Sequence, residues 1–220
     1  PGLVLLMEGA DALRTPADLP AFVADGVRVV GPAWRATRYA GGAGEPGPLT
    51  DPGRQLLDAM ARLEVALDLS HLADEAIAEA LARFPGRVVA SHANCRALVP
   101  GARQLSDAHL RAVADRDGVI GLVLYNRFIR AGWEAGHGKT VTLAELAAHA
   151  RHVKTTVGAR YLALGTDLDG GLGRDDIPRE LDSAADLPTI AGALADSGFT
   201  SGEIDGVLHG NWRRVLRAIL

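Results

Sequence analysis

The sequence predicts an α/β fold, specifically a (β/α)8 barrel of the TIM type in which about six of the eight β-α units are visible. Six short apolar runs indicate buried strands. Because these runs are continuous rather than alternating, they are typical of parallel strands covered on both faces. Helix-like stretches separate the runs, as in repeating β-α units with right-handed crossovers. Polar residues capable of chemistry follow the runs, at the strand ends where barrel enzymes place their sites.

The expected elements follow one another along the whole chain. Strands are predicted at residues 3–7, 27–30, 65–69, 88–90, 119–124 and 161–164, and helices at about 16–25, 51–64, 72–84, 106–117, 142–157, 186–197 and 200–219, the last broken near Gly210. Thr142 precedes Glu145 in capping-box spacing, which marks one helix start. Residues 40–53, rich in Gly and Pro, and residues 125–141 are expected to be long loops after strands, and such loops build active sites.

A doubly wound sheet is the alternative arrangement of the same β-α units. It would concentrate the site at one switch point and favour a G-x-G-x-x-G loop after the first strand. No such loop follows residues 3–7, and the polar residues follow several strands instead. In a closed barrel those strand ends converge on one face, so the pattern favours the barrel. No linker interrupts the chain, and we expect residues 1–220 to form a single domain.

The composition excludes several classes of protein. The 220 residues contain 23 Lys and Arg against 27 Asp and Glu, a net charge of −4, so there is no basic excess for binding nucleic acid. The longest apolar runs have about eight residues, against the ~20 needed to span a bilayer. A single cysteine rules out an intramolecular disulfide framework. We expect a cytoplasmic protein with no membrane span.

Four chemically capable residues end apolar runs. Glu8, His71 and His92 follow three of the runs, and Asp167 follows a fourth. Carboxylate and imidazole groups together suit Zn²⁺ or a similar divalent ion. A single such histidine is more often a hydrogen-bonded residue at a barrel rim, but four residues at equivalent positions favour a site.

Other candidates carry less weight. His149 and His152 are three residues apart on a predicted helix and could pair on a metal, although a solvated helix face is the more common arrangement. Cys95 follows His92 in His-x-x-Cys spacing, and we expect it to be a small buried thiol.

Eight stretches of the sequence resemble the renal (membrane) dipeptidase family, whose members are metal-dependent peptidases related to the amidohydrolase barrels. The ordered set of matching stretches covers the chain from end to end, and it comprises residues 7–13 (MEGADAL), 26–28 (GVR), 67–72 (LDLSHL), 89–98 (VASHANCRAL), 103–107 (RQLSD), 117–121 (DGVIG), 164–170 (LGTDLDG) and 209–216 (HGNWRRVL).

This resemblance implies zinc-dependent hydrolysis of dipeptides by a metal-activated hydroxide, with a small peptide as substrate. The family holds two zinc ions. Glu8 matches the glutamate that bridges them, and His71 and His92 match two histidines on one of them. Asp167 matches the residue that shuttles the proton, whereas Asp169 points the opposite way if the strand extends that far. Arg103 matches the arginine that holds the substrate carboxylate; otherwise it is a surface residue ahead of a helix.

The chain departs from the family at the second metal. The family holds that metal with a His-x-Asp pair at the end of the first barrel strand, and no His-x-Asp occurs in this sequence. By this resemblance the chain corresponds to the C-terminal two-thirds of a member, as a truncated or separately encoded part, or else to a degenerate homologue. We expect at most one firmly bound zinc. We also expect association, either as a homo-oligomer or with a missing N-terminal segment, because an incomplete barrel leaves strand edges unpaired.

A second departure concerns substrate binding. Many members carry a histidine after the Gly-Val-Arg strand that contacts the substrate, and here that region reads Trp-Arg-Ala-Thr-Arg-Tyr. Arg35, Arg38 or Tyr39 could substitute for it. Two alternatives to a dipeptidase therefore stay open: a related metal-dependent amide or lactone hydrolase, and a metal-deficient, non-catalytic barrel fragment.

Overall fold

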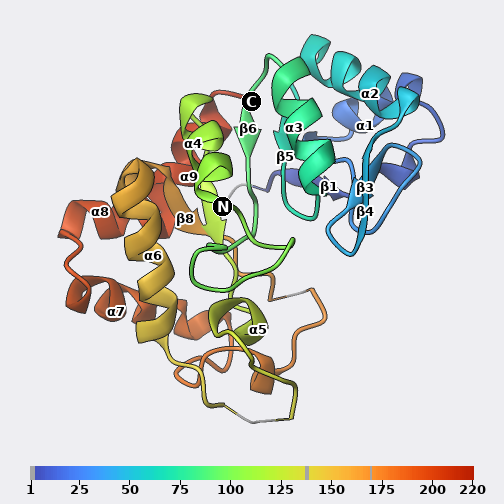
Figure 1. Ribbon diagram of the computed structural model, residues 1–220. Coiled ribbons are helices and arrows are strands. Elements are labelled where there is room, and N and C mark those ends of the chain that lie inside the picture. Colours follow the sequence, from blue (N-terminus) through green and yellow to red (C-terminus); the bar gives the residue numbers. More distant parts are fainter. Residues whose placement is uncertain (1–2, 137–138, 169) are drawn as a thin grey trace. The chain divides into compact units, whose positions relative to one another are not determined.

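The computed structural model describes residues 3–136, 139–168 and 170–220. These residues form two compact units. The first comprises the described part of Pro1–Ala90, with Asp115–Gly118 and Val215–Leu220, and the second comprises Ser91–Ala114 and the described part of Val119–Arg214. Each unit is built around its own parallel strands (Figure 1).

A four-stranded parallel sheet forms the centre of the first unit. Its order is β1 (Leu5–Glu8), β2 (Val27–Gly31), β5 (Ala66–Asp68) and β6 (Val88–Val89). The register places Val30 opposite both Met7 and Leu67. Val30 and Leu67 are fully buried, which explains why these strands appear in the sequence as unbroken apolar runs.

Helices cover this sheet. They are α1 (Leu19–Ala24), α2 (Asp51–Arg62) and α3 (Asp74–Arg83), with a 3-10 turn at Pro16–Asp18. The helices α2 and α3 lie side by side (Figure 1), and two ion pairs, Arg54 with Glu79 and Arg83 with Asp58, join them. The buried Leu56 and Met60 of α2 and Ile77 of α3 supply the apolar layer beneath. The three predicted helices of this unit are therefore confirmed.

The edge strand β1 is incompletely covered. Leu5 and Leu6 are each 38% exposed, and Leu3 just before the strand is 86% exposed. Consecutive strand residues point to opposite faces, so both faces of β1 reach solvent. Parallel strands are normally buried on both faces. An uncovered strand edge is open to pairing with another segment or chain, and association through this edge stays a prediction.

An antiparallel hairpin occupies part of the segment that was expected to be a loop. Its strands are β3 (Ala40–Gly42) and β4 (Glu45–Leu49). A side chain at Gly41 would place its Cβ 2.4 Å from the backbone nitrogen of Gly47, so only glycine allows this close approach. The loop expectation is wrong at these residues because their Gly- and Pro-rich composition conceals a strand pair held by backbone contacts.

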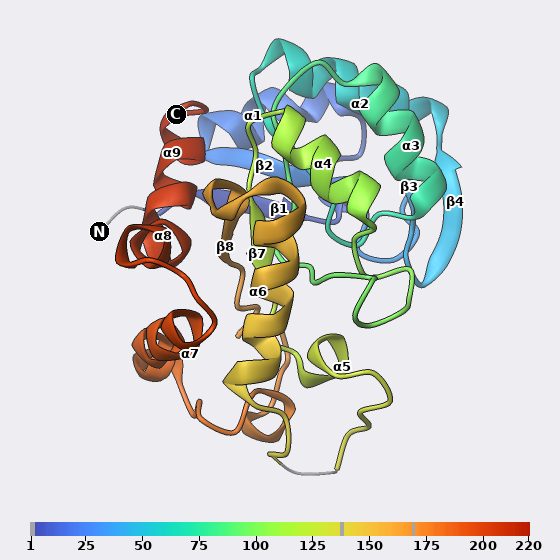
Figure 2. The same ribbon diagram turned by 60° about the vertical axis from the view of Figure 1, so that its left-hand side comes forward.

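A two-stranded parallel sheet lies in the second unit, where β7 (Ile120–Leu122) pairs with β8 (Leu162–Leu164). The long helix α6 (Leu143–Val157) runs alongside both strands (Figure 2). The predicted capping box is confirmed, since the Glu145 carboxylate accepts the Thr142 amide at 2.9 Å and the Thr142 hydroxyl accepts the Glu145 amide. The remaining helices are α4 (Asp107–Asp115), α5 (Asn126–Ile129), α7 (Ile190–Asp196), α8 (Ser201–Asp205) and α9 (Asn211–Arg217).

The predicted break in the last helix is also present. A single turn of π-helix, Gly206–Gly210, separates α8 from α9. The α/β class and all six predicted parallel strands are thus confirmed. In the described part of the chain these six parallel strands form two separate sheets, so closure of a barrel and the single domain stay predictions. Among the described residues, no helix has both the length and the apolar character that crossing a membrane requires.

Candidate metal centre and substrate-binding residues

Glu8 and His71 meet in the first unit. Glu8 is the last residue of β1, and His71 follows the end of β5 by three residues. The Glu8 Oε1 atom lies 3.0 Å from the His71 Nε2 atom, and their side chains are 36% and 16% exposed. Both strands are parallel members of one sheet, so their carboxyl ends lie at the same edge. The fold therefore places a carboxylate and an imidazole in contact at that edge.

The turn after β5 holds His71 in an uncommon backbone conformation. Its φ angle is 69°, in the left-handed region that costs a residue other than glycine about 1–3 kcal/mol. The Ser70 amide donates to the buried Asp68 carboxylate at 3.0 Å, and the Ala43 amide donates to the His71 carbonyl at 2.6 Å. These bonds stabilise the turn that directs the imidazole towards Glu8.

Gly9 lets the chain turn immediately after Glu8. Its φ angle is 80°, and its amide donates to the Gly31 carbonyl at 3.0 Å. A Cβ at this position would lie 3.4 Å from the Trp34 Cβ. The Trp34 ring lies with its centroid 6.2 Å from that of His71. Sequence reasoning did not assign Trp34 to the site, although the Gly-Pro-Ala-Trp segment after β2 was visible.

His92 belongs to the second unit and follows the end of β6 by three residues. It is 7% exposed, and its Nδ1 atom lies 2.7 Å from the Ser91 hydroxyl. A hydrogen bond at one ring nitrogen orients a histidine so that the other nitrogen can bind a metal. The Ser91 hydroxyl thus contacts the His92 ring, a contact that the sequence pattern did not predict. Glu8, His71 and His92 are residue types that together could hold a metal ion.

Asp167 lies three residues beyond the end of β8, in the second unit. Its φ angle is 56°, and its carbonyl accepts the Gly170 amide at 2.9 Å. A Cβ on Gly170 would lie 2.1 Å from the Asp167 Oδ1 atom, so glycine leaves space for the carboxylate. Asp169 lies outside the described residues. Four described residues other than glycine have a positive φ angle, and two of them are His71 and Asp167. Backbone strain of this kind clusters at functional sites.

Arg103 is half-buried in the second unit. Its guanidinium carbon lies 5.4 Å from the centre of the Phe128 ring, within cation–π range. The alternative that Arg103 is an ordinary surface residue is therefore weakened, because the guanidinium has a defined aromatic support.

Arg35 and Tyr39 lie in very different surroundings in the first unit. The Arg35 side chain is 69% exposed and stacks on Trp34 at 5.4 Å. Tyr39 is fully buried, and its hydroxyl donates to the Leu13 carbonyl at 2.6 Å. Burial also raises the pKa of this phenol. We retain Arg35 as a candidate for contact with substrate and leave Tyr39 out of the proposed site.

The expectation for Cys95 is confirmed, whereas that of a solvated His149 is wrong. Burial raises the pKa of the Cys95 thiol to about 12, so it is not a reactive thiolate. His149 is fully buried; its Nδ1 accepts the Cys95 amide at 3.1 Å, and its Nε2 lies 3.1 Å from the Ile129 carbonyl. Because Nδ1 accepts, the proton of the neutral ring lies on Nε2. His149 therefore has a structural role.

We expect His149 to make the protein less stable in mild acid. Burial lowers its pKa from the ordinary 6.5. Below that pH the unfolded chain binds a proton at His149 that the folded chain does not, so stability is lost as the pH falls through about 6.5 and towards the folded pKa. Urea unfolding of the protein and of His149→Gln between about pH 7 and 5 tests this. The variant is expected to be less stable at neutral pH but less sensitive to pH, and an unchanged pH slope would contradict the assignment.

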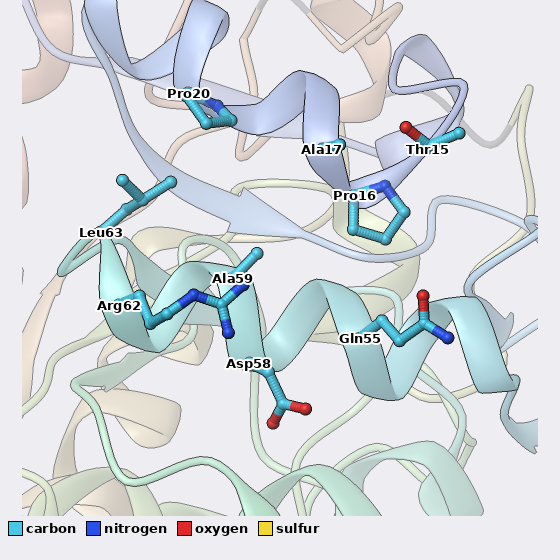
Figure 3. Close-up of a pocket in the computed structure, with 9 residues that line it drawn as sticks. All are labelled: Thr15, Pro16, Ala17, Pro20, Gln55, Asp58, Ala59, Arg62 and Leu63. Atoms are coloured by element: carbon cyan, nitrogen blue, oxygen red, sulfur yellow. The ribbon is translucent and has the colours of Figure 1, made fainter.

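A cavity of about 440 Å³ in the first unit does not contain the predicted site residues. It lies between α2 and the stretch formed by the Pro16–Asp18 turn and the start of α1 (Figure 3), with Gln55, Asp58 and Arg62 on one side and Pro16 and Pro20 on the other. The Asp58 carboxylate is already paired with an arginine of α3. This cavity is therefore separate from the Glu8–His71 pair.

Parallel strands that present a carboxylate–imidazole pair at their carboxyl ends are typical of metal-dependent hydrolases. A sequence profile of the membrane dipeptidase family, peptidase family M19, matches residues 2–220. The chain belongs to this family.

Several relatives are similar over most of the chain. An uncharacterised protein encoded in the region 5′ of pqqA in Klebsiella pneumoniae is 35% identical over 99% of this chain and 82% of its own length. The dipeptidase aclJ of Aspergillus oryzae is 30% identical over 77% of this chain, which spans 39% of that protein.

Solved structures agree with the fold. A metallopeptidase from Rhodobacter sphaeroides, crystallised with a phosphinate mimic of the dipeptide L-Ala-D-Ala, is 27% identical with a TM-score of 0.89. The match covers 99% of this chain and 63% of that one. The chain thus spans less than two-thirds of that metallopeptidase.

Proposed function

We propose that this protein hydrolyses dipeptides with a divalent metal, zinc being the ion that best suits its ligands. The observation that carries the proposal is the contact of Glu8 with His71 at 3.0 Å, at the strand ends, in a chain of the membrane dipeptidase family. The dipeptide mimic bound by the similar Rhodobacter metallopeptidase supports the choice of substrate class.

The side chains of Glu8, His71 and His92 are of types that bind a divalent metal ion. We propose that Glu8 provides a carboxylate oxygen and that His71 and His92 provide ring nitrogens, a ligand set that Zn²⁺ accepts. The Ser91 hydroxyl beside His92 Nδ1 supports this assignment, because it leaves Nε2 as the ligand atom. When bound, a divalent ion acidifies water and polarises the amide carbonyl.

The remaining roles fall to residues of the second unit. Asp167 accepts a proton from the attacking water on its carboxylate and passes it to the leaving amine. Arg103 binds the free carboxylate of the dipeptide through its planar fork of donors. Arg35 is a candidate contact to the substrate from the exposed segment after β2.

We expect Arg103→Ala to raise the KM for dipeptides with a free carboxylate by about 10- to 100-fold, because a hydrogen bond to a charged group contributes roughly 1.5–3 kcal/mol. Dipeptides with an amidated C-terminus lack that charge, so their KM is expected to change little. Steady-state kinetics on matched free and amidated substrates measure both values.

Arg111→Ala is the control for the Arg103 variant, because Arg111 is an exposed arginine of α4 in the same unit. It is expected to leave both constants unchanged. Equal effects of Arg103→Ala on the free and amidated substrates would show that Arg103 does not bind the carboxylate.

A related amide or lactone hydrolase is the second candidate. It is favoured by the segment after β2, which lacks the histidine that many family members place there; Arg35 is exposed in that segment, and the Tyr39 hydroxyl is already bonded to the Leu13 carbonyl. A panel of dipeptides, N-acyl amino acids and lactones separates the two activities. Metal content separates both from a non-catalytic protein.

A further inference from the structure

Two buried amide side chains, those of Asn94 and Gln104, lie close together in the second unit and share one hydrogen-bond partner, the Phe128 carbonyl. Asn94 is fully buried and Gln104 is 2% exposed. The Asn94 backbone amide donates to Gln104 Oε1 at 3.0 Å. Both side-chain NH₂ groups donate to the carbonyl of Phe128, from Asn94 at 3.2 Å and from Gln104 at 3.0 Å. One carbonyl therefore anchors both amides.

Both NH₂ protons and the carbonyl oxygen of the Asn94 side chain have hydrogen-bond partners. Its second NH₂ proton is donated to the Val123 carbonyl at 3.0 Å, and its Oδ1 accepts the Val123 amide at 3.2 Å. The backbone adds a further bond, in which the Leu105 amide donates to the Asn94 carbonyl at 2.9 Å. Because buried polar groups are costly without partners, this arrangement specifies one conformation of the segment from 94 to 105.

One proposed site residue lies just before this segment and another lies near its end. His92 precedes Asn94 by two residues, and the Ala93 amide between them donates to the Gly121 carbonyl at 2.8 Å. Arg103 immediately precedes Gln104, and its guanidinium lies over the ring of Phe128. Phe128 thus holds both amides with its carbonyl and supports Arg103 with its ring.

We infer that Asn94 and Gln104 are positioning residues, which fix the Arg103 guanidinium relative to His92 through the Phe128 carbonyl. This inference rests on the proposed function, in which Arg103 binds the substrate carboxylate. Loss of Gln104 then acts through Arg103 and weakens recognition of the free carboxylate, while the His92 ring keeps its contact with Ser91 and the neighbouring Ala93 amide keeps its bond to Gly121.

Gln104→Met tests this in the intact protein, because methionine has a similar volume but offers no amide. We expect the ratio of kcat/KM for free over amidated dipeptides to fall at least about tenfold, with zinc content unchanged. Asn211→Leu is the matched control. Asn211 is a buried amide of the same unit whose NH₂ group donates to the Ala159 and Leu162 carbonyls at 2.9 and 2.7 Å, at the amino end of β8.

The control is expected to lower Tm while keeping the substrate ratio. An equal fall of kcat/KM on both substrates in Gln104→Met, or the same ratio change in Asn211→Leu, would overturn the inference. If the wild-type protein hydrolyses neither dipeptide, the proposed function has failed. Amide hydrogen exchange then tests the positioning role by itself. Faster exchange confined to residues 93–105 in Gln104→Met supports this role, and unchanged exchange in these residues overturns it.

Discussion

Replacing Asp167 by Asn is expected to lower kcat by about 10²- to 10⁴-fold, the range typical of losing a general acid or base. The amide of Asn cannot take a proton from the attacking water or return one to the leaving amine. The left-handed backbone at Asp167 and the space over Gly170 are compatible with Asn, which tolerates positive φ. The fold is therefore expected to survive, and KM and zinc content are expected to change little.

Asp169→Asn is the matched control, since it makes the same chemical change two residues along the chain. We expect it to have a much smaller effect on kcat. Pre-steady-state and steady-state kinetics on one dipeptide compare the two variants directly. If Asp169→Asn is the more damaging change, the roles within the Asp-Leu-Asp segment are reversed.

The second large effect concerns the metal. We expect the 220-residue chain to bind at most one zinc firmly, because Glu8, His71 and His92 supply a single set of ligands and the sequence has no His-x-Asp pair. Removing His71 or His92 by substitution with Ala is expected to weaken zinc binding by at least about 100-fold, since even loss of a residue supporting a ligand costs 10- to 100-fold. Competition with a chromophoric chelator measures this affinity without any reference to activity.

His152→Ala serves as the control for the two ligand variants. His152 of α6 pairs with Asp107 of α4 in the second unit, with 2.7 Å between Nε2 and Oδ1. Its substitution is expected to leave zinc binding unchanged. Elemental analysis after mild chelation and reloading gives the stoichiometry. Two tightly bound zinc ions per chain would contradict the single-site prediction, and undiminished affinity in His71→Ala would remove that residue from the ligand set.

The sequence alone was sufficient for the elements whose signals are local. The six apolar runs mark the six parallel strands, since buried strands need continuous apolar residues whatever their neighbours are. The start of α6 follows from Thr142 and Glu145, which bond to each other across one turn. The placement of Glu8 at the end of one strand and of His71 after another also followed from the sequence, because parallel strands present their carboxyl ends at one edge.

Only the tertiary structure decided features that depend on contacts between distant segments. The β3–β4 hairpin requires Gly41 against Gly47, a contact that composition presents as a loop. His149 is buried because Cys95 and Ile129, far from it in the chain, provide partners for both ring nitrogens. Likewise, nothing local distinguishes Asn94 or Gln104 from a surface amide. Their role arises from the Phe128 carbonyl, because a buried amide is tolerated only where the fold brings partners to it.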